Sequence, residues 1–146
     1  KIRRAVDGSG KVLGELQKRL KFINAALKSY PGLDIQKLNT VKQLDVKCDN
    51  ISVKLYGDPS LSNRDIEQQE SIASRVGIII WNMWRNRSNP TTTNKMLYTS
   101  AGEDFTIMIE ELNALQIEIT SMEEYLENNK VPYTPGRNLI IDWKIE

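Results

Sequence analysis

Apolar residues recur at alternating intervals of three and four along four segments of the chain, a spacing that places them on one face of an α-helix. In the first segment the pattern is carried by Leu13, Leu16, Leu20, Ile23 and Leu27. No segment before residue 131 shows a convincing period of two, which a half-buried strand requires. The pattern therefore predicts an all-α fold in which four amphipathic helices share one core.

Capping and turn residues predict where these helices begin and end. Ser9 is the expected N-cap of the first helix, with residues 1–10 as a flexible lead-in. Asp34 and Thr91 are the expected N-caps of the second and fourth helices, because short polar side chains can accept from the free amides of a first turn. The predicted helices span residues 11–29, 34–56, 71–87 and 92 to 128 or 129.

The third segment is the most apolar and the least clear in its period. Its stretch from Val76 to Trp81 is rich in β-branched residues and is also compatible with a buried strand. Apolar residues at 72, 73, 76, 79, 80, 83 and 84 favour a helix with a wide apolar face, which belongs in the middle of a bundle. Core packing of at least one of Trp81 and Trp84 is therefore expected.

The connections complete the predicted topology. The polar stretch 57–70 is a long crossover loop, and Pro132, Pro135 and Gly136 break the helical pattern in the tail. We predict a single domain over residues 1–146, with a bundle at 11–129 and an extended C-terminal tail at 131–146. The fold is a four-helix up-down-up-down antiparallel bundle with a long loop between its second and third helices.

Charge is distributed unevenly along the chain. Residues 1–56 hold 12 Lys/Arg and 5 Asp/Glu, whereas residues 57–146 hold 8 and 14, so the two parts carry net charges of +7 and −6. A basic helical hairpin is therefore expected to pack against acidic helices. Each exposed pair contributes only about 0.2–1 kcal/mol, so the pattern favours one pairing arrangement more than it adds stability.

Residue chemistry excludes several functions. The chain contains no histidine and one cysteine, Cys48, so it can form no Cys/His zinc site, no internal disulfide and no histidine-based triad. No catalytic residue, metal or cofactor is expected, and the fragment is predicted not to be an enzyme. Cys48 lies on the apolar face of the second helix, which predicts a buried thiol. No apolar run approaches the roughly 20 residues of a membrane span.

The second half of the chain carries a series of short motifs. Residues 71–76 read Ser-Ile-Ala-Ser-Arg-Val, residues 80–85 read Ile-Trp-Asn-Met-Trp-Arg, Asn-Pro-Thr follows at 89–91, Ala-x-Glu-x-Phe at 101–105, and Val-Pro-Tyr-Thr-Pro-Gly-Arg at 131–137. Over residues 60–137 this series resembles the C-terminal helical region of bacterial sortilin-like β-propeller proteins, which are also described as BNR/Asp-box or glycosyl-hydrolase-like proteins. The ending Pro-Tyr-Thr-Pro-Gly-Arg is its most specific element.

The resemblance implies that this domain is a fragment of a longer exported protein, periplasmic or extracellular, whose propeller lies upstream. The expected function is that of a non-catalytic accessory module that docks onto the propeller or onto another protein. Docking is expected through the tail and the exposed end of the third and fourth helices. The candidate docking residues are Trp84, Tyr133, Pro135, Arg137 and Trp143.

Two alternatives belong to other functional classes. A nucleic acid could bind along the basic face of the first two helices, with its phosphates contacted by Lys18, Arg19, Lys21 and Lys28 together with Arg3 and Arg4. The acidic second half argues against nucleic acid as the partner. The fragment could also belong to a glycosidase-like enzyme whose active site lies outside it.

Overall fold

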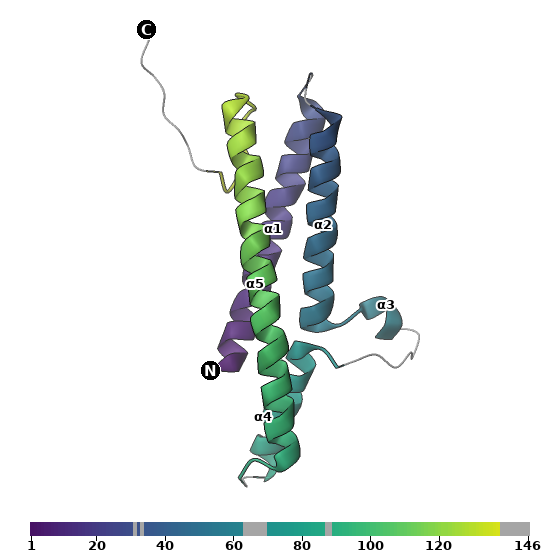
Figure 1. Cartoon of the computed structure of the whole chain (residues 1–146), viewed down its shortest axis with the longest axis vertical. Coiled ribbons are helices and arrows are strands. Elements are labelled where there is room, and N and C mark those ends of the chain that lie inside the picture. Colours follow the sequence, from purple (N-terminus) through teal and green to yellow (C-terminus); the bar gives the residue numbers. More distant parts are fainter. Residues whose placement is uncertain (31, 33, 63–69, 87–88, 138–146) are drawn as a thin grey trace.

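The computed structural model describes residues 1–30, 32, 34–62, 70–86 and 89–137. These residues form five helices and no strand (Figure 1), which confirms the predicted all-α fold. The helices are α1 (Ile2–Ser29), α2 (Ile35–Tyr56), the single turn α3 (Pro59–Ser62), α4 (Ile72–Asn86) and α5 (Thr92–Asn128).

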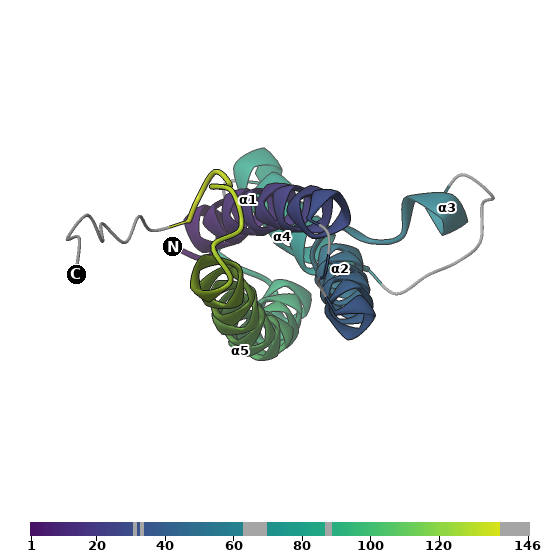
Figure 2. The ribbon, with the colours of Figure 1, turned by 90° about the horizontal axis from the view of Figure 1, so that it is seen from above.

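The long helices form a bundle of three rods, here called legs. The first leg is α1, the second is α2 followed by α4, and the third is α5. Lys54 of α2 pairs with Glu111, whereas Arg75 of α4 pairs with Asp104, so α2 and α4 lie one after the other along α5. The 22 residues of α2 and the 15 of α4 together match the 37 of α5, which is about 55 Å long at ~1.5 Å per residue. Viewed from above, α1, α2 and α5 surround one axis, and α4 lies deeper along it (Figure 2).

The directions of the helices differ from the predicted up-down-up-down order. Both α2 and α4 run antiparallel to α5, and α1 runs parallel to it, which gives an up-down-down-up order (Figure 1). The prediction placed consecutive helices side by side in alternating directions, and it expected the long helix at residues 92–129 to project beyond its partners at one end. The long α5 instead provides a surface on which two shorter helices pack in turn, so the connection from residue 57 to 70 does not return to the opposite end of the molecule.

The first helix begins nine residues earlier than predicted, at Ile2. Val6 and Ser9 are buried and extend the apolar stripe towards the N-terminus. Burial of these added turns outweighs the low helix propensity of the glycines beside Ser9. Ser9 is therefore not an N-cap. Its hydroxyl donates to the Ala5 carbonyl at 2.8 Å, inside the helix.

The other helix boundaries agree closely with the sequence. The Asp34 side chain accepts from the Gln36 amide at 2.9 Å, and the Thr91 hydroxyl accepts from the Asn94 amide at 3.2 Å, as the predicted caps require. Gly57, with φ of 88°, ends α2. The sequence also allows a short helical turn around residues 64–69, and these lie outside the described residues.

The core is made of the predicted stripes. All the stripe residues expected in the first two helices are buried, and Cys48 is fully buried among them. The spacing of apolar residues in the fourth segment also predicts Tyr98 and Phe105 on its buried stripe, but Tyr98 is 51% exposed and Phe105 is only partly buried against the core. The fully buried large side chains are Leu16, Leu20, Ile23, Leu44, Leu55, Ile72, Met108, Leu115, Ile119 and Leu126.

The predicted charge pairing is confirmed by three ion pairs that join the first two helices to α5. Arg19 pairs with Glu123, Lys47 with Glu118 and Lys54 with Glu111, at 2.5–2.6 Å. The last two pairs are largely exposed and form a regular antiparallel register between α2 and α5. Their contribution is to select this pairing of helices rather than to add much stability.

Gly14 should accept alanine with a gain in stability. It lies within α1, and an added methyl group would meet no atom within 4 Å. Because glycine costs a helix interior about 0.5–1 kcal/mol relative to alanine, Gly14→Ala should raise the free energy of unfolding in urea by that amount. Gly32→Ala is the matched control: its methyl group would also meet no atom within 4 Å, but Gly32 has a φ of 96°, which alanine adopts only with strain. An equal gain in both variants would contradict this explanation.

Candidate functional site

Five of the large apolar side chains that are exposed in the described part of the chain belong to the end of the molecule formed by α4 and α5. The Arg75 guanidinium donates to Asp104 at 2.5 Å and to the Ser100 hydroxyl at 2.7 Å, and Asn82 donates to the Asn94 side chain at 3.2 Å. These bonds hold the two helices as an antiparallel hairpin. Between and beyond these bonds lie five large exposed side chains, here called the aromatic end: Trp81, Met83, Trp84, Met96 and Tyr98.

Two residues of the aromatic end occupy core-facing positions that no helix covers. Met83 follows Val76 and Ile79 by seven and four residues, so it lies on their face of α4, yet it is 45% exposed. Tyr98 lies in the same way on the face of α5 that carries Ala101. The cause is geometric: the α4–α5 hairpin continues beyond the N-terminal end of α1 (Figure 1).

The two tryptophans of α4 are both exposed, so the expectation that at least one is in the core was wrong. Trp81 is 58% exposed and Trp84 is 76% exposed. Trp81 lies on the side of α4 opposite Val76 and Ile79, and Trp84 lies at the flank between the two sides. Their rings contact each other instead, with centroids 5.9 Å apart and planes tilted by 34°, a favourable arrangement for two aromatic rings.

The aromatic end also lies in a stretch without carboxylates. No Asp or Glu occurs between Glu70 and Glu103, whereas the stretch contains four arginines and lysines. Arg75 is occupied by Asp104, but Arg85 and Lys95 are exposed and take part in no ion pair of the described part of the chain. Arg87 lies outside the described residues. The absence of acidic residues in this stretch is the sequence signal that could have located this surface. The periodicity of apolar residues alone did not locate it.

The tail residues expected to dock onto a partner instead begin by packing on their own domain. Lys130, with φ of 53°, donates its amide to Glu127, and the Val131 amide donates to Leu126, a Schellman ending of α5 that buries Val131. Thr134 to Arg137 form a turn closed by a 3.2 Å bond, with Pro135 second and Gly136 third at φ of 95°, as in a type II turn.

Arg137 is buried, which makes it unsuitable for the partner contact expected of it. Its side chain is 5% exposed, pairs with Glu127 at 2.8 Å and donates to the Val131 carbonyl at 2.8 Å. The motif Pro-Tyr-Thr-Pro-Gly-Arg therefore has a structural role in this chain, folding residues 131–137 back over the bundle. Tyr133 and Pro135 remain exposed, and Trp143 lies outside the described residues.

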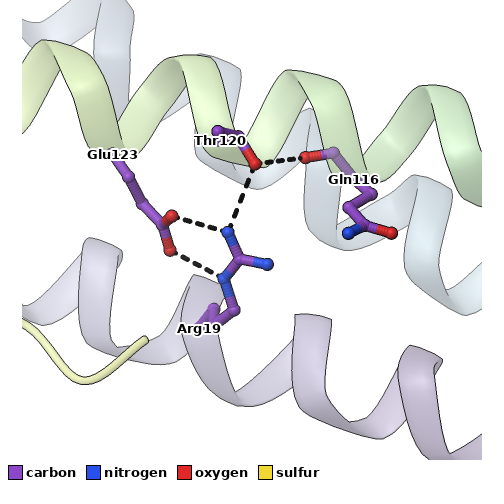
Figure 3. Close-up of polar contacts among 4 residues, drawn as sticks. All are labelled: Arg19, Gln116, Thr120 and Glu123. Atoms are coloured by element: carbon purple, nitrogen blue, oxygen red, sulfur yellow. Dashed lines mark hydrogen bonds and ion pairs between the residues drawn. The ribbon is translucent and has the colours of Figure 1, made fainter. Parts of the chain in front are cut away.

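The folded tail approaches the stem of Arg19, which forms the most buried ion pair between helices with Glu123 (Figure 3). Arg19 Nε and Nη2 donate to the two carboxylate oxygens of Glu123 at 2.8 and 2.6 Å, and Nη2 also lies 3.4 Å from the Thr120 hydroxyl. The hydrogen bond to Glu123 raises the pKa of Arg19. A side chain at Gly136 would lie within 3.1 Å of the Arg19 stem, so glycine permits this close approach.

The basic face of the first two helices is partly used inside the fold. Arg19, Lys47 and Lys54 all reach towards glutamates of α5. The lysines that remain beside one another line a shallow groove between α1 and α2, which also contains an acidic residue, Asp45. The groove lysines are Lys21, Lys28 and Lys42.

Cys48 should be unreactive in the folded chain, because burial raises the pKa of its thiol to about 11. Labelling by iodoacetamide at pH 8 should be slow without denaturant and fast in urea. The unfolded thiol ionises near pH 9, whereas the folded thiol keeps its proton to about pH 11, so this group's contribution to stability is lost between those values. Urea titrations at pH 9 and pH 11 check the sign of this effect. The free energy of unfolding of Cys48→Ala should fall less between these pH values than that of the unsubstituted chain.

The comparisons with known proteins give no relative. No family model, no curated protein and no solved structure matches the chain. Within the described ranges, no cluster of three or more histidine, cysteine or acidic residues is arranged to bind a metal ion. None of the described helices is both long enough and apolar enough to cross a membrane.

Proposed function

We propose that this chain is a non-catalytic interaction module that attaches a longer exported protein to a partner through the aromatic end. One observation carries the proposal: five large apolar side chains, exposed by 45–76%, gather at one end of the molecule. Apolar groups exposed together in this way mark interaction sites, whereas scattered ones need no explanation. Met83 and Tyr98 strengthen the argument, since they extend the core surface beyond the helix that would cover it.

The remainder of the molecule supports an attachment role. The three legs form a body about 55 Å long along α5, so the aromatic end stands well away from the opposite end, where residues 131–137 pack. The resemblance to the C-terminal region of sortilin-like β-propeller proteins suggests what is attached: an upstream propeller, in the periplasm or outside the cell. In this proposal the module contributes binding and position, and any catalysis belongs to other parts of the protein.

Photo-crosslinking tests the proposal without assuming the class of partner. A benzoylphenylalanine is placed at position 84 or, as a control, at position 117 of the full-length protein in the cells that make it. Ile117 is 68% exposed on α5, outside the aromatic end, so both sites are open to solvent. We expect a defined product from position 84 and none from position 117. No product from position 84, or equal products from both, would overturn the proposal.

A further inference from the structure

The exposed side chains of the aromatic end point in several directions. Trp81 and Met83 are two residues apart on α4, and Met96 and Tyr98 are two apart on α5, so the members of each pair point about 160° apart. All four are exposed by 45% or more. A rigid protein surface would cover one side of the hairpin, whereas a fluid interface can surround its end. This arrangement favours a lipid surface.

The charge of the aromatic end indicates which lipids it would meet. Arg85 and Lys95 are exposed there, and no carboxylate lies in the sequence from residue 71 to 102. Cations near a membrane surface attract anionic headgroups, and tryptophan and tyrosine prefer the headgroup level, where one edge of the ring is apolar and the other is hydrated. The acidic part of α5 begins at Glu103, so repulsion would keep the remainder of that helix away from the same headgroups.

We propose that the aromatic end binds the surface of an anionic phospholipid membrane end-on, with Trp81 and Trp84 at the level of the headgroups. The inference rests on the proposed function, because it names the partner of the same surface. Insertion is limited to the tip of the hairpin, at the depth of an interfacial contact, and no helix crosses the bilayer.

Vesicle flotation with the 146-residue chain tests the inference. The probes are vesicles of phosphatidylcholine alone and of phosphatidylcholine with phosphatidylglycerol at a ratio of about 7:3. We expect binding to the anionic vesicles at least tenfold stronger than to the neutral ones, and weaker binding as NaCl increases. Failure to bind anionic vesicles at millimolar lipid would overturn the inference.

Matched variants locate the contact. Trp81→Ser/Trp84→Ser should lower the affinity for anionic vesicles at least tenfold, and Ile117→Ser should leave it unchanged. Arg85→Glu/Lys95→Glu should have a similar effect, whereas Lys18→Glu/Lys21→Glu on α1 should not. These side chains are exposed, so the variants should keep their helical circular dichroism. Full binding by either aromatic-end variant, or equal loss in its control, would contradict the assignment.

Tryptophan emission gives a second readout. In a Trp143→Phe background the emission comes from Trp81 and Trp84 alone, and it should shift to shorter wavelength with anionic vesicles. An unchanged spectrum despite binding would show that another surface makes the contact and would overturn the inference. Crosslinks from position 84 to a protein, together with no vesicle binding, would leave the proposed function standing and remove only the lipid partner.

Discussion

Replacing Arg19 with leucine should lower the free energy of unfolding by about 3 kcal/mol, because it leaves the Glu123 carboxylate without its cation in a nearly dry site. The Glu123 side chain is 6% exposed and that of Arg19 is 20% exposed, so water can replace little of the lost interaction. Leucine keeps much of the apolar stem beside Gly136. Urea unfolding followed by circular dichroism measures the effect.

The matched control is Lys47→Leu on α2. Lys47 makes an ion pair of the same length with Glu118, but the two side chains are 51% and 43% exposed. The free energy of unfolding of Lys47→Leu should therefore fall by less than about 1 kcal/mol. The double variant Arg19→Leu/Glu123→Leu should regain much of the stability, since it removes the unpaired charge. Equal losses in Arg19→Leu and Lys47→Leu would show that burial of the pair has no energetic consequence.

Ile119→Ala should be still more damaging, with a loss of about 3–4 kcal/mol in the free energy of unfolding. Ile119 is completely buried in α5, in the three-leg part of the core, and its truncation removes apolar contacts and leaves a cavity. If the alanine variant does not fold, Ile119→Val provides the measurement, with an expected loss of about 1 kcal/mol.

Ile117 supplies the control for this prediction, because it is the same residue type on the same helix, two positions away, and is 68% exposed. Ile117→Ala should change the free energy of unfolding by no more than about 0.5 kcal/mol. Comparable losses at positions 117 and 119 would mean that the buried face of α5 is assigned incorrectly.

Most local features of the fold could be predicted from the sequence. The stripes of α1 and α2, the caps Asp34 and Thr91, and the pairing of basic helices with an acidic one all depend on neighbouring residues or on charge. The start of α1 could not be predicted in this way. Two glycines beside Ser9 are typical of a flexible lead-in, and only burial of Val6 and Ser9 against other helices outweighs that preference.

The candidate site was predicted only in part. Trp84 was expected at an exposed helix end and lies there, but Trp81 is exposed with it, and Met83, Met96 and Tyr98 were not expected on this surface. Periodicity identifies the face of a helix that can be buried, but it does not show how far the covering helix extends. Arg137 shows the converse, because a charged residue in a proline-rich tail is buried by a turn that brings it to Glu127.

The sequence by itself determined the helices and their apolar faces, since a spacing of three and four, capping side chains and turn residues act within a few positions of one another. The length of α5 already predicted that one of its ends projects, but only the tertiary structure decided that α2 and α4 share one leg along α5 and that the projecting end is the α4–α5 hairpin, which continues past α1. Those outcomes depend on which faces meet at long range and on the relative lengths of the helices. The exposed aromatic end follows from that mismatch in length.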